Sequence, residues 1–153
     1  MVFQIAIEDP RTPDVTNLLQ SHLAFCQSVT PAESVYALDV EKLASPDVTV
    51  FALRENGVLL GVGALRQLEP GHAEIKSMHT SANSRGKGVG KAVVAQILDF
   101  ARARDIERVS LETGNYEAFQ PARKLYESFG FQPCEPFGDY LPSAISICMT
   151  KYL

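Results

Sequence analysis

Two apolar, β-branched runs separated by an Asn-Gly pair place the strongest local constraint on how this chain folds. Residues 48–53 read VTVFAL, residues 58–65 read VLLGVGAL, and Glu55-Asn56-Gly57 lies between them. Asn-Gly is the preferred pair for the tight turn of a β-hairpin, because both central positions of that turn need a positive φ. The sequence therefore predicts an antiparallel hairpin at this point.

Strand and helix patterns alternate along the rest of the chain. Ahead of the hairpin, residues 2–7 have strand character and Thr12-Pro13 is typical of a helix start, whereas residues 28–45 are ambiguous, with Thr30-Pro31 and Asp39 as possible helix starts. The further segments predicted from apolar spacing are a strand at 73–79, a long amphipathic helix at 89–101, a strand at 109–112, a helix at 119–129, a strand from Phe131 and a strand at 145–149. This order predicts a mixed sheet with helices packed on it.

Size and composition indicate one globular domain, residues 1–153. A chain of 153 residues lies within the usual range of about 100–200 residues per domain. The formal charge is -4, from 14 Lys and Arg against 18 Asp and Glu, so the global balance predicts no nucleic-acid or membrane partner. The longest apolar stretch, residues 58–65, is far short of the ~20 residues of a membrane span, and no secretion signal is visible. We therefore expect a soluble, cytoplasmic protein.

The cysteines and histidines predict no metal site. The cysteines are odd in number and lack C-x-x-C spacing, which favours reduced thiols over a disulfide or a zinc framework; they are Cys26, Cys134 and Cys148. His72-Ala73-Glu74 with Pro133-Cys134 partly matches the zinc deaminase signature, but Phe137 stands where the second cysteine is required. The three histidines show no ligand spacing, and we expect His22 to be a packed or surface residue.

The segment Ser84–Lys91, SRGKGVGK, points most directly to a ligand. It lies between a predicted strand and the predicted long helix, and it holds three glycines and three basic residues. Glycines let backbone amides approach a ligand closely, and the following helix N-terminus presents unpaired N–H groups with positive dipole density. A flexible basic turn is the alternative interpretation. In an acidic chain, this local positive charge favours a site for a polyanion such as a pyrophosphate.

Two nucleotide-binding motifs fit this segment poorly. A Walker loop ends in Gly-Lys-Ser/Thr, whereas Gly90-Lys91 is followed by Ala92, so the hydroxyl that binds magnesium is absent. A Rossmann fingerprint follows the first strand of the fold, whereas this segment lies in the middle of the chain after an antiparallel-looking run.

Two motifs resemble those of the GNAT superfamily, the N-acetyltransferases that use acetyl-coenzyme A (acetyl-CoA). Arg85–Gly90, RGKGVG, is similar to the family's [Arg/Gln]-x-x-Gly-x-[Gly/Ala] signature, and residues 122–131, ARKLYESFGF, are similar to its A-x-x-L-Y-x-x-x-G-F motif. Both stand in the family's usual order and at its usual separation. The resemblance implies a stand-alone, bacterial-type N-acetyltransferase with the GNAT fold, a mixed α/β fold whose central, mostly antiparallel sheet has about seven strands and about four flanking helices.

The resemblance also implies how acetyl-CoA is bound. Backbone groups of residues 78–80 would face the pantetheine arm, and the amides of residues 85–90 would bind the pyrophosphate. The strands around residues 74–79 and 109–113 would splay apart to admit the co-substrate. The residues implied to contact acetyl-CoA are Met78, His79, Thr80, Arg85, Gly86, Lys87, Gly88, Val89, Gly90 and Tyr126.

For the chemistry, the resemblance implies direct attack of a substrate amine on the thioester. Tyr126 matches the family's general acid, although packing on a helix face is its alternative role. Glu74 is the first candidate for general base and Glu112 the second, and either is alternatively a solvated strand carboxylate. The backbone N–H of Met78 would donate to the developing oxyanion.

The acceptor is expected to be a small amine or an amino-acid-like molecule, with no metal and with a homodimer as a possible assembly. Side chains suggested to line its pocket are Ser34, Tyr36, Lys76, Phe137, Asp139 and Tyr140. Two alternatives stay open: acetylation of a protein N-terminus or lysine, and a CoA-binding module without turnover.

Overall fold

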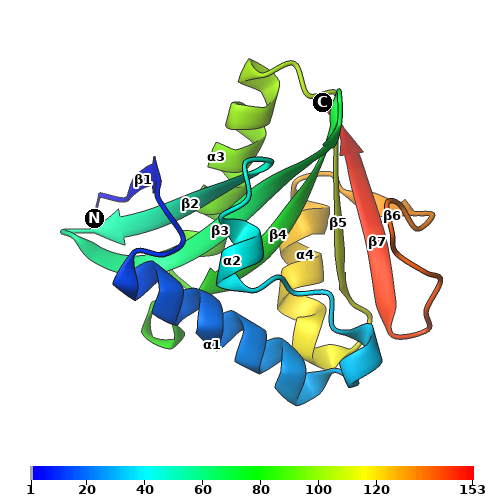
Figure 1. Cartoon of the computed structure of the whole chain (residues 1–153), viewed down its shortest axis with the longest axis horizontal. Helices are drawn as coiled ribbons and strands as arrows, with labels where there is room; N and C mark the ends of the chain where they lie inside the picture. The colour runs from blue at the N-terminus through cyan, green and yellow to red at the C-terminus, as the bar shows by residue number, and fades with distance from the viewer. Residues whose placement is uncertain (1) are drawn as a thin grey trace.

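The structure is a computed structural model that describes residues 2–153. Its centre is one seven-stranded sheet with strand order β1-β2-β3-β4-β5-β7-β6 (Figure 1). Adjacent strands are antiparallel except for the parallel pair β4 and β5. The strands are β1 (Gln4–Ile7), β2 (Val48–Glu55), β3 (Val58–Glu69), β4 (His72–Thr80), β5 (Arg108–Gly114), β6 (Gln132–Cys134) and β7 (Ser146–Tyr152).

Helices cover both faces of this sheet. In Figure 1, α1 and α2 lie in front of the sheet, whereas α3 and α4 lie behind it. The helices are α1 (Pro13–Val29), α2 (Val40–Leu43), α3 (Val89–Ala103) and α4 (Gln120–Ser128), with single 3₁₀ turns η1 (Ala32–Ser34), η2 (Ala82–Ser84) and η3 (Glu117–Phe119). The mixed α/β architecture expected from the sequence, a mostly antiparallel sheet of about seven strands with about four flanking helices, is confirmed.

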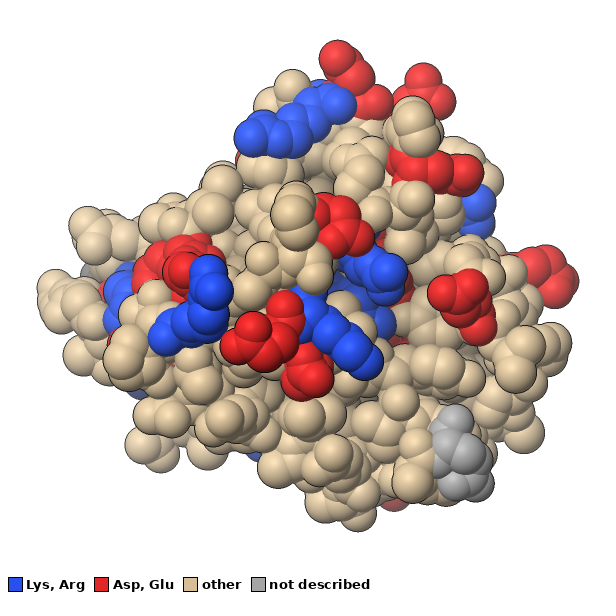
Figure 2. All heavy atoms as spheres, in the orientation of Figure 1, with Lys and Arg blue, Asp and Glu red and all other residues tan. Residues whose placement is uncertain are grey.

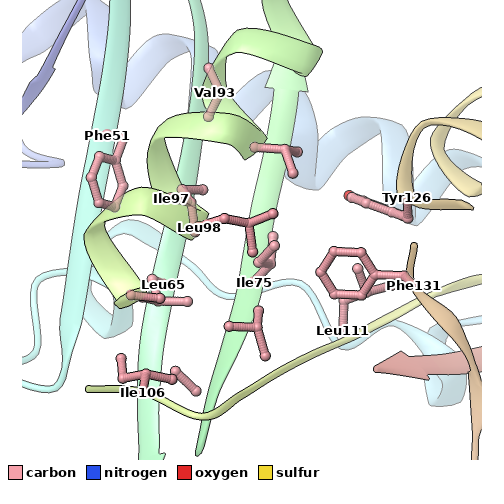
Figure 3. Packing of buried hydrophobic residues seen from close by; sticks show 14 of the residues in the cluster. Phe51, Leu65, Ile75, Val93, Ile97, Leu98, Ile106, Leu111, Tyr126 and Phe131 are labelled. Carbon is pink, nitrogen blue, oxygen red and sulfur yellow. The ribbon is translucent and has the colours of Figure 1, made fainter. Parts of the chain in front are cut away.

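The core consists of two apolar clusters, one on each face of the sheet. The larger cluster lies under α3 and α4 and includes Phe51, Ile75 and Ile97 (Figure 3). The smaller cluster packs α1 and α2 onto β2 and β3. Burying one large aliphatic or aromatic side chain contributes about 1.5–3 kcal/mol, so both helical layers are held mainly by these contacts.

The hairpin predicted from Asn56-Gly57 is present. β2 and β3 pair in antiparallel register out to Glu55 and Val58, and φ is +52° at Asn56 and +81° at Gly57. These positive φ values are those that a two-residue primed turn requires.

Several element boundaries differ from the sequence-based expectation. The first strand is Gln4–Ile7 rather than residues 2–7, since it pairs only with β2 at the edge of the sheet. Burial along β4 is continuous from His72 to Ile75 instead of alternating, because both faces of this central strand are covered. The helix expected at residues 119–129 is present as α4 at Gln120–Ser128, because a 3₁₀ turn ends at Phe119 just before it.

The parallel strands β4 and β5 diverge soon after they meet. Their register contains three pairs, His72↔Arg108, Ala73↔Val109 and Glu74↔Ser110, and none of the later residues of either strand pairs across this boundary. Figure 1 shows the two strands separating from a common start near the C-terminus of the chain. The sequence-based expectation that these strands splay apart agrees with this register.

A β-bulge interrupts β4 beside the divergence. On β3, Val62 pairs with His79 and Ala64 with Lys76, so Ser77 and Met78 together stand opposite Gly63. Ser77 adopts a φ of +57°, and its buried hydroxyl has no hydrogen-bond partner among the described residues. A bulge turns backbone groups out of the ladder, which explains how this part of β4 faces away from β3.

Residues 2–153 contain no helix that is both long and apolar enough to cross a bilayer. Figure 2 shows acidic and basic side chains interspersed on the face presented in Figure 1.

The strain at Ser77 generates a stability prediction. Ser77→Gly removes both the left-handed penalty of a residue with a Cβ and the unpartnered hydroxyl, so we expect a free energy of unfolding equal to or above that of the wild type. Ser77→Val places a β-branched residue in the same conformation and should destabilise the protein by roughly 1–3 kcal/mol. Urea unfolding of both variants measures this difference, and a Val variant as stable as the Gly variant would contradict the bulge geometry.

Candidate active site

One large cavity opens where β4 and β5 diverge. Its volume is about 720 Å³. Its walls come from the C-terminal half of α1, the segment after α1, β4, the glycine-rich segment, β5, α4 and the start of β7. A cavity of this size is typical of a small-molecule or cofactor site.

The glycine-rich segment forms one end of the cavity. Gly86 and Gly88 adopt φ values of +79° and +82°, and a Cβ at either position would meet no atom within 4 Å. Gly88 is the N-cap of α3 and supplies no side chain to the first turn, and that turn carries no acidic residue. The first amides of a helix have no intrahelical acceptor. The N–H groups at the start of α3 are therefore available to an anionic ligand.

These features fit the diphosphate of acetyl-CoA. Positive dipole density at a 15-residue helix adds to the charges of Arg85 and Lys91, both of which line the cavity. Lys87, also expected to bind the co-substrate, is exposed and is not among the lining residues. The expected residues Met78, His79, Thr80, Gly86, Gly88, Val89, Gly90 and Tyr126 all line the cavity.

Among the side chains that the structure describes, the carboxylate that lines this cavity is that of Glu112. It lies on β5, two residues beyond the last pair formed with β4, and it is half-buried. Burial raises the pKa of Glu112 from 4.5 to about 7, an effect that the positive charge of Lys76 partly offsets and the negative charge of Glu74 reinforces. A carboxyl group with this pKa exchanges a proton readily at neutral pH.

Glu74 occupies a different environment. Only 2% of the residue is exposed, and it is absent from the residues that line the cavity. The Tyr140 hydroxyl donates a hydrogen bond to its carboxylate, and the Lys76 ammonium lies 3.5 Å from the same oxygen. The carboxylate of Glu74, the first candidate for general base from the sequence, is therefore already in contact with Tyr140 and Lys76.

Tyr126 lies on α4 between the core and the cavity. It is 6% exposed, and its ring packs edge-on against Phe131 with 6.0 Å between centroids (Figure 3). Burial and the nearby charge of Glu112 raise the pKa of its phenol above the usual value near 10. Tyr126 therefore stays protonated at neutral pH and is available as a hydrogen-bond donor.

Aromatic and imidazole rings from α1, β4 and the segment between β5 and α4 form one wall of the cavity. His22 on α1 faces His79 on β4, with 3.3 Å between their Nδ1 atoms, and Phe25 packs edge-on against Phe119. Burial lowers the pKa of His22 to about 4 and that of His79 below its usual value, so both rings are neutral at pH 7. Tyr116 hydrogen-bonds Thr30 and so joins this wall to the end of α1. The wall is therefore largely apolar and uncharged.

The residues at the glycine-rich end of the cavity were predicted from the sequence more completely than those of this wall. Of the suggested acceptor residues, Ser34, Tyr36 and Lys76 line the cavity. The other three do not line it: Phe137 is buried, Asp139 is exposed and Tyr140 is half-buried. His22 and Cys26 were not expected to line a site, because their i, i+4 spacing on α1 is that of an ordinary core stripe. Among residues 2–153, no group of His, Cys, Asp and Glu side chains is arranged to hold a metal ion.

Comparison with known protein families and sequences identifies acetyltransferases. The sequence profile of the Acetyltransferase (GNAT) family matches residues 14–131. The uncharacterized N-acetyltransferase YsnE of Bacillus subtilis (strain 168) is 48% identical over 149 residues, which cover 97% of this chain and 99% of that protein. The IAA acetyltransferase of Azospirillum brasilense is 36% identical and covers 97% of each chain.

Solved structures of acyltransferases and acetyltransferases have the same fold as this chain. An acyl-CoA N-acyltransferase structure from Klebsiella pneumoniae superposes with a TM-score of 0.81 and 26% identity over 99% of this chain and 98% of that one. A GNAT family acetyltransferase from Elizabethkingia anophelis, solved with acetyl-CoA bound, has a TM-score of 0.73 and 15% identity over 99% and 98% of the two chains.

The raised pKa of Glu112 generates a prediction about stability and pH. The folded protein holds this proton to about pH 7, whereas the unfolded chain releases it near 4.5, so the carboxyl group contributes less and less to stability as pH rises through this interval. Glu112→Gln should therefore raise the free energy of unfolding at pH 8 by on the order of 1–3 kcal/mol and leave it nearly unchanged at pH 4.

Denaturant titrations at the two pH values measure this difference, with the exposed Glu117→Gln as the control substitution. An equal effect of Glu112→Gln at pH 4 and pH 8 would show that the carboxyl group is not shifted.

Proposed function

Since this chain belongs to the GNAT acetyltransferase family and is an acyl-CoA-dependent acetyltransferase, we propose that it transfers the acetyl group of acetyl-CoA directly to an acceptor amine. The acceptor in this proposal is the primary amine of a small molecule or amino-acid-like compound. The two substrates are held together in one ternary complex, and no acyl-enzyme forms.

One observation carries this proposal. A single cavity connects the amide groups at the start of α3 with the carboxyl group of Glu112, and it runs through the gap between β4 and β5. Direct transfer needs both reactants in one enclosed space, because holding them in place converts a bimolecular step into an effectively unimolecular one.

Binding of acetyl-CoA relies mainly on the backbone. The N–H groups of residues 85–90 and the dipole of α3 receive the diphosphate, and the bulged part of β4 faces the pantetheine arm. Because the bulge takes Met78 out of register with β3, its backbone N–H is the proposed donor to the thioester carbonyl as negative charge develops there.

Glu112 is the proposed general base. An ammonium ion has no lone pair, so the acceptor amine must lose a proton before it attacks. Glu112 lines the cavity and has a pKa of about 7, which suits proton uptake at neutral pH. Glu74 takes second place in this assignment, because it is covered and already bonded to Tyr140.

Tyr126 is the proposed hydrogen-bond donor to the departing thiolate. Its phenol is protonated and it lines the same cavity as Glu112. A thiol has an ordinary pKa near ~8.5, so the thiolate is a good leaving group that needs stabilisation more than full protonation.

A small acceptor is favoured by the walls of the cavity. The Thr30–Tyr116 hydrogen bond joins the end of α1 to the segment after β5, and both residues line the cavity. The Azospirillum brasilense relative is named an IAA acetyltransferase, without reference to a protein acceptor. Thiol release from acetyl-CoA, measured across small primary amines, amino acids and peptides, tests this assignment: release with peptides alone would favour a protein acceptor, and release with none would favour a binding module.

Tyr126→Phe tests the donor role. With the best amine of that panel, we expect kcat to fall by on the order of 10–100-fold, because the variant cannot donate to the thiolate. The Kd for acetyl-CoA, measured by calorimetry, should change little. Tyr152→Phe at an exposed position is the matched control. Unchanged turnover in Tyr126→Phe would leave this side chain a packing role alone.

Two glutamine substitutions test the base. The wild-type pH profile of kcat/KM should lose activity below about pH 7, where Glu112 becomes protonated. Glu112→Gln should abolish this acid limb and lower activity at pH 8 by on the order of 100-fold or more. Glu74→Gln should retain an acid limb, and the opposite pattern would return the base to Glu74.

A further inference from the structure

We propose that Lys76, fixed in place by Tyr140 and Glu74, is a positioning residue that keeps Glu112 ionised and so ready to accept the amine proton. This inference rests on the proposed role of Glu112 as general base. In this inference, the function of Glu74 and Tyr140 is to hold the ammonium group of Lys76 in place.

The three side chains form a closed set of polar contacts. The Lys76 ammonium donates to the Tyr140 hydroxyl at 2.7 Å and lies 3.5 Å from the Glu74 carboxylate, and the Tyr140 hydroxyl donates to that same carboxylate. The side chains of Lys76 and Glu74 are 8% and 3% exposed. Buried charges are tolerated only when they are paired and hydrogen-bonded, so this arrangement determines where the ammonium group sits.

Lys76 and Glu112 lie on the same face of the sheet, one on each of the two diverging strands. The last register pair of β4 and β5 is Glu74↔Ser110, and Lys76 and Glu112 each stand two residues beyond it. Side chains two residues apart on a strand lie on the same face, and both residues line the cavity. The Lys76 and Glu112 side chains therefore lie on one face of the sheet and line one cavity, with the gap between β4 and β5 separating their strands.

Among the charged groups that act on Glu112, Lys76 is the one that stabilises its ionised carboxylate. On β4, Lys76 favours the carboxylate and Glu74 disfavours it, with Lys76 the larger of the two. Other titratable or polar groups also interact with Glu112, and they come from α1, α4, the β6–β7 segment and β7. These groups are Cys26, Tyr126, Tyr140, Ser146 and Cys148. The thiols and phenols among them are neutral at pH 7, because burial raises their pKa values.

Tyr140 connects this arrangement to the segment between β6 and β7. Its ring makes edge-on contacts with Tyr36 at 4.8 Å and with Phe137 at 5.0 Å between centroids. Tyr36 comes from the segment between η1 and α2, and Phe137 comes from the same β6–β7 segment as Tyr140, so the two rings hold the phenol where it bridges Lys76 and Glu74. Without the hydroxyl, the ammonium group loses its shorter hydrogen bond and is free to move away from Glu112.

Two variants test the inference through the pH profile of kcat/KM. Lys76→Met combined with Glu74→Gln removes both charges and leaves no unpaired buried ion. Tyr140→Phe keeps both charges and removes the bridging hydroxyl. For each variant we expect the acid limb to move upward by about half a pH unit or more, so that the ratio of kcat/KM at pH 6 to kcat/KM at pH 9 falls about threefold relative to the wild type, whatever the value reached at pH 9. The exposed Tyr152→Phe is the control and should retain the wild-type limb.

A second measurement needs no acceptor. NMR titration of the Glu112 side-chain carboxyl group should give a higher pKa in both variants than in the wild type. An acid limb and a carboxyl titration that stay at the wild-type position in both variants would overturn the inference. Failure of the base assignment itself looks different, because the acid limb would then persist in Glu112→Gln.

Discussion

The parallel pairing of β4 and β5 ends after three residue pairs, and the remainder of the active site depends on that divergence. A continuous ladder would leave no space between these strands, since neighbouring strands lie ~4.8 Å apart. The bulge at Ser77 and Met78 turns β4 away from β3 at the same level. The structure accommodates a residue at positive φ and an unpartnered hydroxyl there, which is the kind of local strain commonly found at functional sites.

In the proposed function, binding and chemistry are divided between backbone and side chains. At one end of the cavity, the amides before and within α3 provide positive potential in a chain whose net charge is -4. At the other end, burial and neighbouring charges set the protonation of Glu112. As proposed, the backbone end requires glycines and a helix, whereas the chemical end requires a carboxyl group placed near a fixed cation. These two requirements explain why the two ends differ in how clearly the sequence reveals them.

Local patterns predicted most of the fold. The Asn56-Gly57 hairpin, the glycines before α3 and the apolar spacing of the helices all act within a few residues, so they were visible in sequence. Which glutamate faces the cavity was not, because it depends on the register between β4 and β5, whose pairs lie 36 residues apart in the chain. The contacts of Tyr140 with Lys76 and of His22 with His79 also join distant segments. No local pattern specifies such pairs, and His22 lies on an ordinary helical stripe.

The central claim is that backbone amides of residues 85–90 hold the diphosphate of acetyl-CoA beside the divergent strands. Titration of ¹⁵N-labelled protein with acetyl-CoA, followed through the backbone amide signals, tests it most directly. The account predicts that the amide signals of Gly86, Gly88 and Gly90 shift together and saturate, while those of Gly57 and Gly71, in turns that do not line the cavity, stay in place. Unmoved signals at residues 85–90 with saturating acetyl-CoA would contradict it.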